Sequence, residues 1–68
     1  MYQNLKLEMA KRDITNRKVA AILEIHENTA AYKLNGEGSF SIEEAFKLKE
    51  ELFPMLDLKY LFKRTVAL

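Results

Sequence analysis

The sequence predicts an all-α protein: a compact bundle of four to five short helices that forms one domain over residues 1–68. Three observations support this prediction. The chain has only two glycines and one proline and is rich in Leu, Ala, Lys and Glu, which favour helices. Its apolar residues recur at helical spacing. Residues of the types that cap helices precede the apolar segments.

The composition excludes several kinds of site. The chain has no cysteine, so disulfides and thiolate metal sites are excluded, and its one histidine is too few for a histidine-based zinc site. No apolar run reaches the roughly 18 residues of a membrane span. Residues 1–12 alternate charged and apolar side chains, unlike a signal peptide, so we expect a cytoplasmic protein.

The first two predicted helices cover residues 4–12 and 16–23. Asn4 caps the first and Thr15 the second, because short polar side chains accept hydrogen bonds from the free N–H groups of a helix start. The spacing of the apolar residues points five of them inward: Leu5, Met9, Val19, Ala20 and Leu23.

A turn at residues 24–26 leads to a third helix over residues 27–35. Only Ala30 and Leu34 are convincing core positions in this helix. Gly36 ends it, since glycine readily adopts the left-handed conformation that follows a helix.

Ser41 and Glu44 match a capping box at the start of a fourth helix, which runs to about Leu52 before Pro54 prevents its continuation. Its apolar residues at helical spacing are Ile42, Ala45, Phe46, Leu52 and Phe53. Asp57 caps a short fifth helix. The apolar residues that follow either close the core or contact a second copy of the chain: Leu58, Tyr60, Leu61, Phe62 and Val66.

Residues 15–36 therefore contain two short helices separated by a three-residue turn. This is the arrangement of a helix-turn-helix, at about residues 16–35, in which the second helix turns a free face to the DNA major groove. With Ala30 and Leu34 inward, a helical wheel places Asn28, Thr29, Tyr32 and Asn35 on the outward side. Asparagine can pair bidentately with adenine, and a threonine methyl can contact a thymine methyl.

The residues Ile14–Leu23, Thr29-Ala30 and Leu34-Asn35-Gly36, with Phe40-Ser41 and Glu44-Ala45-Phe46, resemble the Cro/phage-repressor (lambda-repressor-like) helix-turn-helix family in a short prophage-type form. The resemblance covers residues 5–62. It implies a sequence-specific transcriptional regulator, acting as a repressor in a bacterial host, that binds a double-stranded DNA operator. It also implies a homodimer, at least on DNA, and no cofactor.

The resemblance implies base contacts at Glu27 and Asn28, where the third helix starts, and at Tyr32 one turn later; Thr29 shares their outward face. Glu27 could accept a hydrogen bond from a cytosine amino group. Alternatively, Glu27 and Asn28 serve only the helix start, where acids are favoured by the helix dipole. Tyr32 is then a surface aromatic residue or part of a protein interface.

Phosphate contacts are expected around the same two helices. Asn16 occupies the position where the family usually has a phosphate-holding Gln, and Asn35 matches a position that can touch the DNA backbone. Arg17, Lys18 and Lys33 are phosphate partners by charge alone. Arg17 and Lys18 could equally be ordinary solvated residues of a helix surface.

Three features depart from the family pattern, and one of them is Glu27, which brings negative charge toward the DNA. Glu24 stands where the turn usually has Gly, so a left-handed backbone there would cost about 1 kcal/mol. Met9 and Leu34 stand where many members have a paired Arg and Glu. Because replacing a whole buried ion pair by apolar residues is often neutral or stabilising, we expect Met9 and Leu34 to contact each other.

The charge distribution leaves a second function open. The net charge is only +1: residues 1–36 carry six Lys or Arg against four Asp or Glu, and residues 37–57 carry two against six. A protein-interaction module on the same fold, such as an antirepressor or adaptor, would suit that balance and could use Tyr32, the acidic fourth helix or Phe62. An enzyme is not expected, since there is no cysteine nucleophile and no plausible partner for the single histidine.

Overall fold

In the computed structural model, residues 2–64 are described, and this part of the chain forms five α-helices and no strand. The helices are α1 (Gln3–Lys11), α2 (Asn16–Leu23), α3 (Glu27–Leu34), α4 (Ile42–Leu52) and α5 (Leu58–Leu61). The predicted all-α fold is confirmed. Within residues 2–64, no helix combines the length and the apolar character that crossing a membrane requires. Val66, one of the side chains predicted for the core or a dimer contact, lies outside the described residues.

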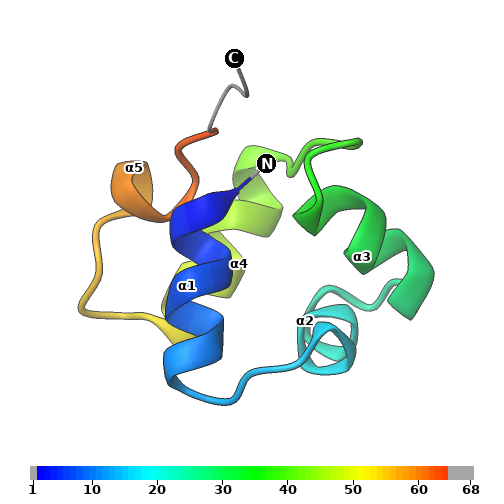
Figure 1. Cartoon of the computed structure of the whole chain (residues 1–68), viewed down its shortest axis with the longest axis horizontal. Coiled ribbons are helices and arrows are strands. Elements are labelled where there is room, and N and C mark those ends of the chain that lie inside the picture. Colours follow the sequence, from blue (N-terminus) through cyan, green and yellow to red (C-terminus); the bar gives the residue numbers. More distant parts are fainter. Residues whose placement is uncertain (1, 65–68) are drawn as a thin grey trace.

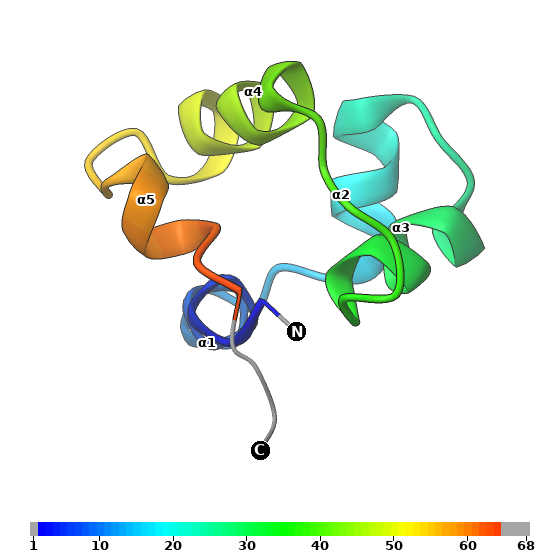
Figure 2. The same ribbon diagram turned by 90° about the horizontal axis from the view of Figure 1, so that it is seen from above.

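The helices surround one core. In Figures 1 and 2, α2 and α3 lie on one side of the molecule and α5 on the other, with α1 and α4 between them. The buried apolar side chains come from all five helices and from two flanking residues: Tyr2, Leu5, Met9, Val19, Ala20, Ala30, Leu34, Leu48, Phe53 and Leu61. Met9 and Leu34, which the sequence predicts to contact each other, are both buried in this core.

Three of the predicted helix starts are confirmed. Thr15 Oγ1 accepts a hydrogen bond from the Lys18 amide at 3.2 Å, at the start of α2. Ser41 and Glu44 form the complete capping box of α4, with hydrogen bonds of 3.1 and 2.9 Å. Asp57 Oδ2 accepts from the Tyr60 amide at 3.3 Å at the start of α5. These caps satisfy N–H groups that have no partner within their own helices.

The predicted cap of the first helix is wrong. Asn4 lies inside α1, which begins at Gln3. Its side-chain amide nitrogen, Nδ2, instead donates to the backbone carbonyl of Tyr60 at 2.9 Å. The helix starts earlier because Tyr2 is buried and its carbonyl accepts from the Lys6 amide at 3.1 Å. Core packing of Tyr2, together with this bond, fixes the helix start without a side-chain cap.

The predicted apolar stripe of the fourth helix is also partly wrong. Ile42 and Phe46 lie on the outer side of α4, 75% and 47% exposed, whereas Leu48 is fully buried. The inward positions are Ala45, Leu48 and Leu52, which follow each other at intervals of three and four residues. The helix is therefore rotated relative to the prediction, and two large apolar side chains of α4 face solvent.

Three aromatic rings close the core beside the start of α4. The ring centroids of Tyr2 and Phe40 are 5.2 Å apart, those of Tyr2 and Phe62 are 6.0 Å apart, and those of Phe40 and Phe62 are 5.4 Å apart. Such tilted and edge-on pairs are the favoured aromatic geometries. They join the N-terminal segment, the connection before α4 and the residue after α5.

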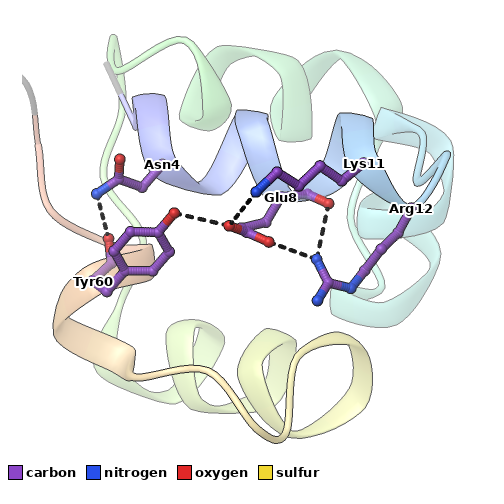
Figure 3. Close-up of polar contacts among 5 residues, drawn as sticks. All are labelled: Asn4, Glu8, Lys11, Arg12 and Tyr60. Carbon is purple, nitrogen blue, oxygen red and sulfur yellow. Dashed lines mark hydrogen bonds and ion pairs between the residues drawn. The ribbon is translucent and has the colours of Figure 1, made fainter.

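A buried carboxylate links α1 to α5. Glu8 is 6% exposed and accepts hydrogen bonds from Arg12 at 2.6 Å and from the Tyr60 hydroxyl at 2.8 Å, with the Lys11 ammonium at 3.6 Å (Figure 3). The hydrogen bond from Arg12, assisted by that from Tyr60, holds the pKa of Glu8 below its ordinary value. Tyr60, which the sequence left open between core and interface, is partly exposed and serves this network.

We expect Glu8→Gln to lower the thermal unfolding temperature at pH 7, because the amide loses the charge-assisted hydrogen bond from Arg12. The folded-state pKa lies below the ordinary value of 4.5, so the stabilisation is present above pH 4.5 and is lost as the pH falls through the folded pKa. Circular dichroism melts of both chains should therefore differ most at pH 7 and converge as the pH falls through the folded-state pKa of Glu8.

Tyr60→Phe is the matched control for this prediction, since it keeps the Glu8 carboxylate and removes only the hydrogen bond from the Tyr60 hydroxyl. Its unfolding temperature at pH 7 should lie between those of the wild-type and Glu8→Gln chains. A difference between wild type and Glu8→Gln that does not change with pH would contradict the assignment.

Candidate nucleic-acid interface

Two eight-residue helices, α2 and α3, are joined by a turn at residues 24–26. The bounds of α2 are those predicted, and α3 ends at Leu34, one residue before the predicted end. Gly36 follows with a φ of 85°, the left-handed conformation expected of it. Both helices are therefore short and have well-defined ends.

The turn depends on a left-handed glutamate. Glu24 has φ 57° and ψ 44°, and its amide donates to carbonyls in the last turn of α2. A non-glycine residue in this conformation costs about 1 kcal/mol, as expected from the sequence. The next residue, Ile25, packs against the core, and its amide donates to the Ala20 carbonyl at 3.0 Å. These contacts hold the turn in spite of its strain.

Two residues attach α3 to the core. Ala30 and Leu34 are 0% and 1% exposed, and Ala20 of α2 is buried with them. The small side chains of Ala20 and Ala30 allow the two helices to pack closely. The opposite side of α3 is free: Glu27, Asn28, Thr29 and Tyr32, the four predicted base-contacting residues, are all exposed.

The first turn of α2 carries three further predicted contact residues. Asn16, Arg17 and Lys18 are all exposed. Among residues 2–64, no ion pair or side-chain hydrogen bond engages the two cations. They lie at a helix start, where the dipole and the free N–H groups favour a negatively charged ligand. A shallow hollow lined by Arg17, Glu24 and residues 25–27 separates this turn from the start of α3.

Unlike Arg17 and Lys18, Lys33 forms an ion pair within the protein. Its Nζ lies 2.8 and 2.9 Å from the two carboxylate oxygens of Glu44, and both side chains are partly buried. Partial burial raises the pKa of Glu44, but hydrogen bonds from Lys33 and Ser41 outweigh it, so the pKa lies below its ordinary value. The capping box predicted the bond between Glu44 and Ser41; the bond to Lys33, eleven residues away, has no local sequence signal.

The end of α3 is held by cations from both ends of the chain. The Lys6 ammonium donates to Asn35 Oδ1 at 3.1 Å. Arg64 donates to the Gly36 carbonyl and to the Ser39 hydroxyl, and its guanidinium lies 5.4 Å from the centre of the Tyr2 ring. The sequence-predicted phosphate partner Asn35 is exposed but already accepts a hydrogen bond within the protein.

The ring of Tyr32 packs against Gly38, a residue for which the sequence predicts no role. A Cβ atom on Gly38 would lie 2.8 Å from two ring carbons of Tyr32. The Tyr32 carbonyl also accepts from the amides of Glu37 and Gly38, at 3.2 and 3.3 Å. One side of the ring therefore rests on the backbone, while half of the residue, 51%, remains exposed.

The outward face of α2 and α3 has hydrogen-bonding capacity but little net charge. Its amide, hydroxyl, phenol and carboxylate groups can donate and accept on one exposed surface. Arg17 and Lys18 are balanced by Glu24 and Glu27, which are both exposed. Residues 2–64 contain no cluster of three or more potential metal ligands. The face is suited to recognising a hydrogen-bonding surface.

Comparison of the chain with protein-family models, curated proteins and solved structures finds no match. The function is therefore inferred from the geometry of α2 and α3. The decisive features are the narrow attachment of α3 and the polar side chains that it leaves accessible.

We expect Glu24→Gly to increase the free energy of unfolding by about 1 kcal/mol, because glycine adopts the left-handed conformation without a Cβ penalty. Denaturant unfolding of the two chains measures the difference. Glu24→Ala is the control: it removes the carboxylate, whose contact with Lys47 at 4.0 Å is exposed and weak, but keeps the Cβ. Equal stabilisation by both substitutions would show that charge, and not backbone strain, is responsible.

Proposed function

We propose that the chain is a sequence-specific DNA-binding transcriptional regulator of the phage or prophage repressor type, and that α2 and α3 act as its helix-turn-helix. The observation that carries the proposal is that Ala30 and Leu34 are the only buried residues of α3, so that Asn28 and Tyr32 are left accessible. A helix presented in this way fits the major groove of B-DNA.

Base recognition is assigned to the exposed side of α3. Asn28 pairs bidentately with an adenine, and the Thr29 methyl contacts a thymine methyl. Glu27 accepts a hydrogen bond from a cytosine amino group. Tyr32, whose ring is supported by Gly38, contacts a base or the adjacent backbone.

Phosphate binding is assigned to Asn16, Arg17 and Lys18 at the start of α2 and to Asn35, which directly follows α3. Lys33 can contact a phosphate only if its ion pair with Glu44 breaks. These contacts position the protein and make its affinity depend on salt. The regulator acts in a bacterial cytoplasm, binds its operator as two copies on related half-sites, and needs neither a cofactor nor a catalytic group.

A protein-interaction module is the second candidate, and the near balance of charge on the face favours it. Glu24 and Glu27 oppose Arg17 and Lys18 there. In such an antirepressor or adaptor, the exposed ring of Tyr32 would contact a protein surface, because tyrosine is enriched in protein interfaces.

Selection of bound duplexes from a random-sequence pool, followed by mobility-shift titration, tests the proposal. We expect a short half-site to be enriched. Asn28→Ala should weaken binding to it by about 10- to 100-fold and relax the preference at one base pair. Arg17→Ala should weaken binding to all sequences and reduce the salt slope by about 1.

Lys49→Ala serves as the control, since Lys49 bonds the Pro54 carbonyl at the end of α4 that lies away from α3 (Figure 2). This variant should bind as the wild type does. No retention of any duplex at low salt, where non-specific binding is strongest, would refute DNA binding and favour the protein-interaction module.

The role of Lys33 can be tested through its partner. Glu44→Gln keeps a side chain that can complete the capping box but removes the charge that neutralises Lys33. We expect tighter DNA binding at low salt and a salt slope steeper by about 0.9, corresponding to one more phosphate contact. Lys33→Met in the Glu44→Gln background should return the slope to the wild-type value. An unchanged slope in Glu44→Gln would place Lys33 outside the DNA contact.

A further inference from the structure

An open apolar hollow lies where the start of α4 approaches α5, away from the proposed DNA-binding face. Its floor and walls include the rings of Phe40 and Phe62 and the side chains of Ala45 and Leu58. The fold thus leaves a concave apolar surface beside its core.

A protruding apolar side chain stands at the rim of the same hollow. Ile42 lines it and is 75% exposed, and Phe46, one turn further along α4, is 47% exposed. A contact between two identical copies related by a two-fold axis uses one patch on both, so the patch must complement itself. A projecting side chain beside a hollow on one face meets this condition.

Opposite charges flank this surface. Glu43 follows Ile42 in the first turn of α4, and Lys59 of α5 lines the hollow. Both are exposed, and neither has an ion-pair partner among residues 2–64. In a two-fold pair, Glu43 of each copy can lie against Lys59 of the other, so the contact is complementary in charge as well as in shape.

We infer that this surface, which we call the α4–α5 patch (Phe40, Ile42, Glu43, Phe46, Leu58, Lys59 and Phe62), is the contact between two copies of the chain. Ile42 of each copy enters the hollow of the other. The inference deepens the proposed function, in which two copies occupy two half-sites, by locating their contact. The Glu27 end of α3 lies away from the patch in both views, so the reading face stays free (Figures 1 and 2).

The patch is small, so the pair is weak. Its seven residues are fewer than the roughly 20–30 that each partner contributes to a standard interface, and we expect association between about 10 µM and 1 mM. Sedimentation equilibrium without DNA over this range tests the inference. Ile42→Asp should weaken self-association at least tenfold. Met55→Asp is the control, since Met55 is 83% exposed but lies outside the patch, and it should associate as the wild type does.

Charge exchange provides a second test. Glu43→Lys and Lys59→Glu should each weaken association, and the double variant should restore it, because the pairing is then reversed. On dilution, amide resonances of residues in the patch should shift in ¹⁵N NMR spectra, whereas those of Glu27 and Asn28 should not.

A wild-type chain that is monomeric at about 1 mM would overturn the inference, as would equal effects of Ile42→Asp and Met55→Asp or dilution shifts centred elsewhere. Circular dichroism confirms that each variant is folded. All these measurements are made without DNA, so failure of self-association and failure of DNA binding are separate results.

Discussion

The close packing of α3 against α2 through Ala20, Ala30 and Leu34 is the contact on which the rest of the structure depends. It buries one narrow side of a helix of eight residues, too short to be stable by itself in water. A wider apolar stripe would stabilise the helix more and leave less of it accessible. Two core side chains therefore set both the stability of α3 and the width of its exposed face.

The supports around α3 compensate for this narrow attachment. Lys33 with Glu44, Lys6 with Asn35 and Arg64 with Gly36 join the last turns of α3 to three other segments. Among residues 2–64, no comparable side-chain contact holds the Glu27 end. The C-terminal end of α3 is thus held by several contacts, whereas its N-terminal end is exposed. This difference favours the first half of the helix as the part that recognises a ligand.

Local chemistry explains which features could be predicted from the sequence. The caps at Thr15, Ser41 and Asp57, the stop at Gly36 and the strained turn at Glu24 each depend on residues within four positions of one another, so spacing alone identifies them. Features that depend on packing between distant segments were missed. The rotation of α4 that exposes Ile42 and buries Leu48, the burial of Glu8, and the pairing of Lys33 with Glu44 follow from tertiary contacts without a periodic signal. The polar face of α3 can be predicted from the sequence because Ala30 and Leu34 define the inner side of the helix.

The carboxylate shared between α1 and α5 limits how the fold can be recombined. Glu8 accepts from Arg12 in its own segment and from Tyr60, 52 residues away. A chimera that takes α5 from another protein without a donor at the position of Tyr60 would leave a buried carboxylate with fewer hydrogen bonds, at a cost in stability. Helices α1 and α5 therefore form one exchangeable unit, although they stand at opposite ends of the chain, and segment-swapping experiments should transfer them together.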